Sequence, residues 1–317
     1  MNVAELKEEI EELKKSTNSI ILSHYYQELD VQSIGDFLGD SLGLSRKAAS
    51  VKNAEHIVFA AVDFMAEVAK MLNPTKNVLL PDPTASCPMA NQLTGEEVRT
   101  YKKKYPKLPA VIYINTLAEA KAECDVVCTS ANSVKVCTAI AEEWGVDKIL
   151  MGPDKNLSHF VQTETGLEVV IMPEKGCCYV HDQFIVEDAN MQTQRYPDAD
   201  VIVHPECKPE IQDLADFIGS TSQMIKYVEN SSEKKEFIIG TEQGMIDYLQ
   251  NKHPDLKLHS LSPTGVFCRN MKKTTLEKVR NLFLKIQDGE FGNHSMTLDP
   301  AIAKKAKEAI DKMFDYT

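Results

Sequence analysis

Short apolar segments alternate with polar, breaker-rich segments along the whole chain. The apolar runs are rich in Val and Ile, and Pro, Gly, Ser or Asp follows them before the next stretch of helical spacing. This alternation is typical of βα units that build a parallel sheet. The strands expected on this basis cover residues 20–24, 57–61, 77–80, 110–115, 125–129, 148–153, 167–172, 201–206, 216–219, 236–240 and 256–261.

The pattern repeats three times, with a period of about 90 residues. Each repeat closes with an apolar run, a loop containing Pro or Gly, and a cysteine. These cysteines are Cys87, Cys178 and Cys268, which are 91 and then 90 residues apart. Three thiols carried by three equivalent loops can meet at one point, and thiols gathered at one point indicate a metal site.

Polar residues recur with the same period at the ends of other expected strands. Each repeat has one such residue at the end of its first strand, a hydroxyl residue after its second strand and a carboxyl residue after its third strand. The sets are His24, Tyr113 and His204; Ser41, Ser130 and Thr221; and Asp63, Asp154 and Glu242. We expect the hydroxyl residues to be helix N-caps. Because ligands bind outside the carboxyl ends of strands in open α/β sheets, these residues are also expected to share a site.

The repeat predicts three α/β units with short parallel sheets. Their expected bounds are residues 1–87, 88–178 and 179–268. Residues 269–317 are expected to form a helical tail that packs on the first unit.

Composition narrows the possible functions of the 317-residue chain. Its net charge of −12 argues against a nucleic-acid partner, since phosphate binding needs clustered Lys and Arg. No apolar run is long enough for a membrane span, and residues 1–16 form an amphipathic helix without a signal-peptide core. We therefore expect a cytoplasmic protein. Eight cysteines in such a chain indicate thiols or metal ligands more than disulfides.

Two kinds of metal centre fit three convergent cysteines. Structural zinc takes four protein ligands, so a zinc site would need His181 or Cys177 as the fourth. A [4Fe–4S] cluster held by three cysteines leaves one iron open, and an open iron is a Lewis acid that can help water to leave. Spacing alone does not choose between them. The remaining cysteines are interpreted as packed core thiols: Cys124, Cys128, Cys137 and Cys207.

Eight short motifs follow one another in order over about residues 20–280. They are His24-x-Tyr26-Gln27, Gly39-Asp-Ser41, Cys87-Pro-Met-Ala, Tyr113-Ile-Asn115-Thr, Val127-Cys-Thr-Ser130-Ala-Asn132, Gly176-x-Cys178-x-Val-His181, His204-Pro-Glu206-Cys and Cys268-x-x-Met271-Lys. As a set they resemble the quinolinate synthase A family. Each motif alone is a weak signal, but the ordered set is specific.

The resemblance implies a fold, a cofactor and a reaction. The family has three similar α/β units around a pseudo-threefold axis, and it binds a [4Fe–4S] cluster through one cysteine per unit, here Cys87, Cys178 and Cys268. The motif Gly-x-Cys-x-Val-His selects Cys178 over Cys177. The family condenses iminoaspartate with dihydroxyacetone phosphate to quinolinate in NAD biosynthesis, releasing phosphate and two waters. An aspartate-oxidising enzyme supplies the iminoaspartate.

The resemblance also implies roles for individual residues. Glu206 is the expected general base, with His204 beside it, and Tyr26 and Tyr113 are expected to shuttle protons or contact phosphate. The open iron would bind a carboxylate or hydroxyl group of the substrate and assist the final dehydration. The expected substrate-binding residues are His24, Ser41, Tyr113, Ile114, Asn115, Ser130, His204, Pro205, Glu206 and Thr221.

Two other classes of protein compete with this interpretation. A non-catalytic iron–sulfur or zinc sensor with three α/β units needs the thiols, but it does not need polar residues such as Asn115 and Glu206 at the strand ends. A nucleotide-binding α/β protein is disfavoured because the chain has neither a GxGxxG fingerprint nor a Walker A motif.

Overall fold

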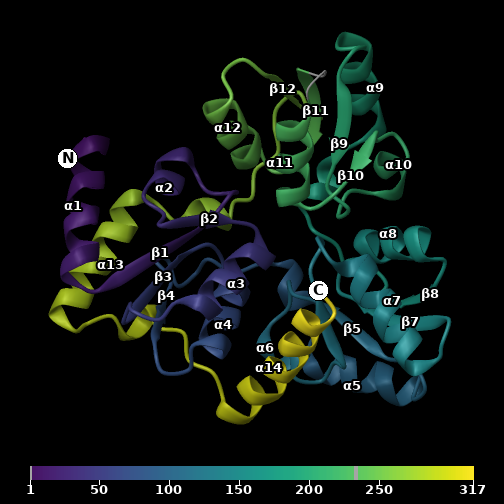
Figure 1. The fold of residues 1–317 in the computed structure, drawn as a ribbon, viewed down its shortest axis with the longest axis horizontal. Coiled ribbons are helices and arrows are strands. Elements are labelled where there is room, and N and C mark those ends of the chain that lie inside the picture. Colours follow the sequence, from purple (N-terminus) through teal and green to yellow (C-terminus); the bar gives the residue numbers. More distant parts are fainter. Residues whose placement is uncertain (1, 232–234) are drawn as a thin grey trace. The chain divides into compact units, whose positions relative to one another are not determined.

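The computed structural model describes residues 2–231 and 235–317. Over these residues the strands form three four-stranded sheets, in which every pairing is parallel (Figure 1). The strand order is the same in each sheet: second, first, third, fourth. The expected α/β fold with three similar units is therefore confirmed.

The chain divides into two compact units. Unit 1 contains Met1–Cys87 and Cys268–Ala303, and unit 2 contains Pro88–Phe267 and Lys304–Thr317. Unit 1 holds one sheet and unit 2 holds the other two. The division of the chain into four parts at residues 87, 178 and 268 stays a prediction.

Unit 1 has one sheet, ordered β2-β1-β3-β4, with helices from both ends of the chain. Its strands are β1 (Ser19–His24), β2 (Phe37–Gly39), β3 (His56–Ala60) and β4 (Asn77–Leu79). Its helices are α1 (Val3–Ser16), α2 (Leu29–Ser33), α3 (Ser41–Ser50), α4 (Asp63–Leu72) and α13 (Leu276–Asp288), with 3₁₀ turns η3 (Met271–Lys273) and η4 (Gly292–His294).

Unit 2 has two sheets, ordered β6-β5-β7-β8 and β10-β9-β11-β12. The strands are β5 (Ala110–Tyr113), β6 (Val126–Cys128), β7 (Lys148–Gly152), β8 (Glu168–Ile171), β9 (Asp200–Val203), β10 (Phe217–Ile218), β11 (Glu236–Gly240) and β12 (Lys257–Ser260). The helices are α5 (Gly95–Lys104), α6 (Ala118–Lys121), α7 (Ser133–Trp144), α8 (Lys155–Thr165), α9 (Val186–Arg195), α10 (Pro209–Gln212), α11 (Thr221–Asn230) and α12 (Gln243–Lys252), with 3₁₀ turns η1 (Met89–Gln92) and η2 (His181–Gln183).

The two helices expected in the tail are α13 and α14 (Pro300–Asp315). In unit 1, α13 lies against α1, and Phe283 packs with Ile10 and Ile21 in one buried apolar cluster (Figure 1). In unit 2, Lys312 near the end of α14 forms an ion pair with Glu143 of α7, with 2.8 Å between Nζ and Oε1.

The helix caps differ from the sequence-based expectation, which was wrong for all three hydroxyl residues. Ser41 and Thr221 are the first residues of their helices, and the caps are their neighbours Asp40 and Ser220. The Asp40 carboxylate accepts from the Gly43 N–H at 2.8 Å, and Ser220 forms a capping box with Gln223. Ser130 precedes α7 by more than one residue, because Asn132 occupies its N-cap position.

The described helices include none that is both long enough and apolar enough to cross a membrane.

Candidate functional site

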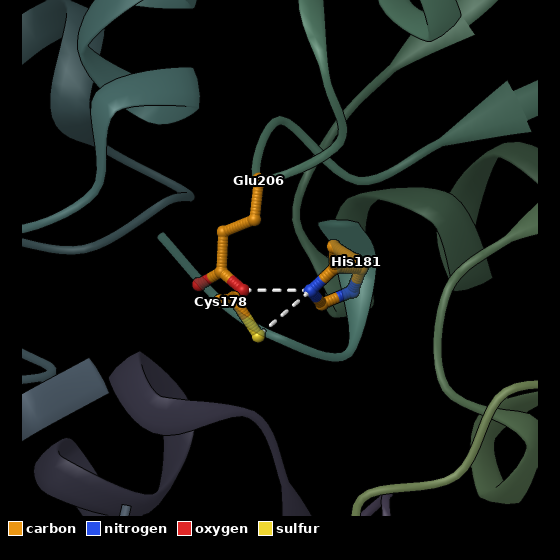
Figure 2. A group of neighbouring side chains, drawn as sticks. All are labelled: Cys178, His181 and Glu206. Carbon is orange, nitrogen blue, oxygen red and sulfur yellow. Dashed lines mark hydrogen bonds and ion pairs between the residues drawn. The ribbon is translucent and has the colours of Figure 1, made fainter. Parts of the chain in front are cut away.

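Four side chains meet at the carboxyl ends of strands in unit 2. They are Tyr113, Cys178, His181 and Glu206, which we call the Glu206 group. The Glu206 carboxylate lies 2.7 Å from His181 Nδ1, and its other oxygen accepts the Tyr113 hydroxyl at 2.6 Å. His181 Nδ1 is also 3.4 Å from Cys178 Sγ. Figure 2 shows Cys178, His181 and Glu206 directed toward one another.

Neighbouring polar groups fix the orientation of His181 and of a second histidine beside it, His204. His181 Nε2 lies 2.9 Å from Thr241 Oγ1, and the His181 ring stacks on His204 with centroids 4.5 Å apart. The backbone N–H of Glu206 donates to His204 Nδ1 at 3.2 Å. His204 therefore accepts through Nδ1, which leaves its proton on Nε2 in the neutral form. Tyr113, His181, His204 and Glu206 are nearly fully buried.

The buried charges push the pKa values in this group apart. Burial alone would raise the pKa of Glu206. The electrostatic influence of the neighbouring His204 and His181 rings, with hydrogen bonds from His181 and Tyr113, instead holds that pKa well below its usual value. Burial, followed by the charge of Glu206, raises the pKa of Tyr113. Glu206 is thus an ionised acceptor at neutral pH, and Tyr113 is a protonated donor to it.

Asp154 holds the loop that carries Cys178. One carboxylate oxygen accepts the Cys178 N–H at 2.9 Å, and the other caps α8 through Asn156 and Leu157. Burial and the charge of Glu206 raise the pKa of Asp154, although its backbone hydrogen bonds oppose that shift. A Cβ on Gly176 would lie 1.9 Å from the Pro153 carbonyl oxygen, so only glycine lets this loop pack against the β7–α8 turn.

Asp63 makes the same contact in unit 1. Its carboxylate accepts the Cys87 N–H at 3.1 Å, and its own N–H donates to the Ala85 carbonyl oxygen at 2.9 Å. Unit 2 has a matching bond from the Lys155 N–H to the Gly176 carbonyl oxygen at 2.8 Å. In the first two repeats, the start of the helix after the third strand is therefore hydrogen-bonded to the backbone of the loop that carries the cysteine.

Side-chain amides hold the residue before two of the three cysteines. In unit 1, the Asn270 amide donates to the Ser86 carbonyl oxygen, which joins the Cys87 loop to the turn after Cys268. In unit 2, Gln92 makes two hydrogen bonds to the backbone of Cys177: Oε1 accepts its N–H at 2.9 Å, and Nε2 donates to its carbonyl at 3.3 Å.

Of the remaining predicted residues of unit 1, His24 and Tyr26 lie at the end of β1. Tyr26 is buried, and its ring meets the His24 ring edge-on with centroids 4.6 Å apart. The Tyr26 N–H donates to His24 Nδ1 at 3.1 Å, the same bond that Glu206 makes to His204. Ser41 is partly buried at the start of α3. Cys87 and Cys268 of this unit are partly buried, as is Cys178 of unit 2.

The remaining predicted residues of unit 2 lie just beyond β5, β6, β9 and β10. Ile114, Pro205 and Thr221 are buried. Ser130 is partly buried, and its hydrogen bond to the Tyr113 hydroxyl counteracts part of the rise in that pKa. Asn115 is partly buried, and its Oδ1 has no hydrogen-bond partner among the described residues.

The other cysteines behave largely as the sequence predicted. Cys128, Cys137 and Cys207 are fully buried, and the Cys207 thiol lies 3.4 Å from the Gly240 carbonyl oxygen. Cys124 as a whole residue is only partly buried, but its thiol donates to the Lys121 carbonyl oxygen. Burial of this thiol raises its pKa to about 12. These four are therefore poor metal ligands.

Sequence reasoning missed several members of the site. Asp63 and Asp154 stood out through their repeat phase, yet their contact with the cysteine backbone was not foreseen. The sequence indicates His181 as a possible fourth zinc ligand and as part of a family motif, but it does not indicate that His181 lies between Glu206 and Cys178. Asn270 and Gln92 gave no periodic signal.

Comparison with known proteins places the chain in a family. The sequence model of the family described as "Quinolinate synthetase A protein" matches residues 8–315. The quinolinate synthase of Thermococcus onnurineus is 45% identical over 317 residues, covering 100% of both chains. The quinolinate synthase of Methanothermobacter thermautotrophicus is 44% identical over 309 residues, covering 98% of this chain and 97% of the relative. That of Methanocaldococcus jannaschii is 44% identical over 313 residues, covering 98% of each.

The family match spans all three repeats and every motif quoted above. The resemblance expected from those motifs is confirmed, and the chain belongs to the quinolinate synthetase A family of enzymes.

Proposed function

We propose that this enzyme condenses iminoaspartate with dihydroxyacetone phosphate to quinolinate, releasing phosphate and two waters, as a step of NAD biosynthesis. The observation that carries the proposal is the buried Glu206 group, in which an ionised carboxylate lies between a phenol donor and an imidazole beside Cys178. An enzyme that oxidises aspartate would supply the unstable imine. We expect the reaction in the cytoplasm.

The chemistry of the thiols fits a [4Fe–4S] cluster held by Cys87, Cys178 and Cys268. Each of these cysteines is partly exposed and follows the fourth strand of a sheet, whereas Cys128, Cys137 and Cys207 are buried in the core. Iron–sulfur clusters are held by cysteine thiolates, and three ligands leave one iron without a protein ligand. When bound, the cluster supplies that iron as a Lewis acid for binding a substrate oxygen and assisting dehydration.

Glu206 is suited to act as the general base. Its carboxylate is ionised at neutral pH and lies within hydrogen-bonding distance of Tyr113 and His181, so it can accept a proton during condensation and cyclisation, although its lowered pKa makes it a weaker base than a free carboxylate. Tyr113 donates to one of its oxygens, and the neutral phenol can return a proton to a developing hydroxyl. His204 presents Nε2–H as a further donor, because its Nδ1 is occupied by the backbone.

The start of α7 offers a place for an anionic group of the substrate. Asn132 occupies the N-cap position without making a side-chain cap, and its Nδ2 is buried. Ser133 Oγ is also buried, and neither atom has a hydrogen-bond partner among the described residues. A helix N-terminus with uncapped N–H groups attracts carboxylate or phosphate. Asn115 Oδ1, which also lacks a hydrogen-bond partner in the described part of the chain, adds an acceptor for a substrate N–H or O–H.

Anaerobic purification followed by iron and sulfide analysis tests the cofactor. We expect about four irons and four sulfides per chain. An assay with dihydroxyacetone phosphate and enzymatically generated iminoaspartate then tests the reaction, with quinolinate and phosphate measured separately. A full cluster without quinolinate formation would favour the sensor interpretation. A protein that forms neither a cluster nor quinolinate after any bound zinc has been removed and reconstitution with iron and sulfide has been attempted would contradict both the cofactor and the reaction.

A further inference from the structure

We propose that Cys178, His181 and Glu206 form a second kind of metal site, which binds one divalent ion of the zinc class when the chain carries no iron–sulfur cluster. One thiol sulfur, one imidazole nitrogen and one carboxylate oxygen of these residues all lie within 4.8 Å of one another. Figure 2 shows the three side chains directed toward a common point.

The spacing of the donor atoms suits a tetrahedral ion. Zinc bonds of about 2.0–2.3 Å place neighbouring ligand atoms roughly 3–4 Å apart. Cys178 Sγ and His181 Nδ1 are already 3.4 Å apart, while Glu206 and His181 Nδ1 are 2.7 Å apart and need to separate slightly. Three protein ligands then leave the fourth position to water or a small molecule, as in catalytic zinc sites.

Contacts around the three residues match those that support metal ligands. In the absence of an ion, His181 donates from Nδ1 to Glu206. When an ion binds, this proton leaves Nδ1 and the neutral ring carries its proton on Nε2, which lies 2.9 Å from Thr241 Oγ1, so that Nδ1 becomes the metal-binding nitrogen. Tyr113 donates to the Glu206 oxygen that does not face His181, which leaves the facing oxygen for the ion. Asp154 fixes the backbone of Cys178. Each of the three ligands therefore has a positioning partner outside the site.

Charge balance also favours a divalent ion. A thiolate, a carboxylate and a neutral imidazole together carry two negative charges, so a bound divalent ion makes this buried group neutral. The Cys178 thiol loses its proton to solvent when the ion binds, and no electron is transferred. Because Cys178 is also a proposed cluster ligand, zinc and the cluster exclude each other. A zinc-loaded chain would then be unable to assemble the cluster until the ion is removed.

A full-length Cys87→Ser/Cys268→Ser double variant separates the two metal centres. It lacks two of the three proposed cluster ligands but retains Cys178, His181 and Glu206. Titrated anaerobically with cobalt, it is expected to bind about one ion per chain, with a thiolate-to-cobalt charge-transfer band and the visible bands of tetrahedral cobalt. Zinc should displace the cobalt.

Further variants in the same background locate the site. Cys178→Ser should abolish the charge-transfer band, and His181→Gln and Glu206→Gln should each weaken cobalt binding by at least about tenfold. Cys177→Ser is the matched control and should bind cobalt like the parent. Absence of the band in the folded parent would overturn the proposal, as would its persistence in Cys178→Ser.

Two further measurements keep the outcome decisive. If circular dichroism shows that the double variant is unfolded, the same titration is run on cluster-stripped wild-type, Cys177→Ser and Cys178→Ser chains. Iron analysis of the double variant tests the cluster proposal separately. A full cluster in this variant would refute the assignment of Cys87 and Cys268 as cluster ligands, and the cobalt titration could still be interpreted. Zinc added before reconstitution of the wild-type chain is expected to reduce cluster yield, and an unchanged yield would contradict exclusion.

Discussion

The side-chain amide of Asn270 donates a hydrogen bond to the backbone carbonyl oxygen of Ser86, the residue before Cys87. Asn270 itself lies two residues after Cys268, so one bond joins the segments that carry two of the proposed cluster ligands. The contact lies wholly within unit 1, although 184 residues separate its partners in the sequence.

Loss of this bond is expected to loosen the Cys87 loop. Asn270→Ala should lower the free energy of unfolding by about 1 kcal/mol and accelerate the loss of iron to a chelator. Asn251→Ala, at an exposed position of α12, is the matched control and should change neither quantity. Chelation rates followed by absorbance test this prediction, and equal rates in Asn270→Ala and wild type would contradict it.

Neighbouring cysteines are expected to differ sharply in their importance for the cluster. Cys178→Ser should lose it, because serine does not replace a thiolate ligand, while Cys177→Ser should retain about four irons per chain. Iron and sulfide analysis after anaerobic reconstitution provides the comparison. A full cluster in Cys178→Ser would show that the ligand assignment is wrong.

Glu206→Gln is expected to retain the cluster and lose most turnover. The amide has nearly the shape of the carboxylate but cannot accept a proton, so turnover should fall by about 10²- to 10⁴-fold. Tyr113→Phe keeps the base and removes its 2.6 Å donor, so it should cause a smaller loss. Initial rates of quinolinate formation, normalised to iron content, measure both effects. Wild-type turnover in Glu206→Gln would remove this residue from the mechanism.

Asp154 is expected to matter for the order of the Cys178 loop. Asp154→Ala removes a helix cap as well as the acceptor for the Cys178 N–H, so it should cost about 1–2 kcal/mol of stability. In the cluster-free chain, alkylation of Cys178 should also become faster. Asp154→Asn retains one acceptor oxygen and should lie between Ala and wild type. Peptide-resolved mass spectrometry measures alkylation, and an unchanged rate at Cys178 in Asp154→Ala would argue against the positioning role.

The Asp82–Lys278 ion pair predicts a pH-dependent contribution to the stability of unit 1. Burial opposes ionisation of Asp82, but hydrogen bonds from Lys278 and Thr84 outweigh it and lower the pKa from 3.8 to about 2. A carboxyl group with a lowered folded-state pKa stabilises the fold above its unfolded pKa. This contribution is lost as the pH falls from about 4 to about 2.

Lys278→Met should therefore lower the free energy of unfolding by at most about 1 kcal/mol near neutral pH, because the lysine is partly exposed. The difference from wild type should shrink through the acidic range, whereas Lys305→Met, at an exposed site, should show no such trend. Denaturant titrations at several pH values measure the difference. A gap that does not change with pH would contradict the assignment.

The three-unit architecture could be predicted because short sequence segments indicate each strand and the same pattern of segments repeats three times. Short Val- and Ile-rich runs mark buried strands, and the period of the cysteines fixes the number of sheets. The same periodicity located the ends of the first strands, where His24, Tyr113 and His204 lie. The strand order within each sheet did not follow from the pattern, because the first strand pairs with both the second and the third, so that the consecutive second and third strands are not neighbours.

Side-chain partners could not be predicted in the same way. Asp40 and Ser220 cap their helices, one residue before the expected caps Ser41 and Thr221. A periodic pattern does not locate the end of a helix to within one residue. The pairing of Tyr113 with Glu206 joins residues 93 apart in neighbouring sheets of unit 2. Such contacts depend on how two sheets pack, which no local pattern encodes.

The packing of α13 on α1 has a consequence for how the chain is made. Leu6 and Ile10 of α1 share a buried cluster with Val279 and Phe283 of α13, a helix that is translated after all the other buried residues of this cluster. The first sheet therefore leaves the ribosome before helix α13 is synthesised. Its apolar face stays without this covering helix while the other two sheets are synthesised. A nascent chain stalled before residue 276 would expose that face and would be a natural substrate for chaperones.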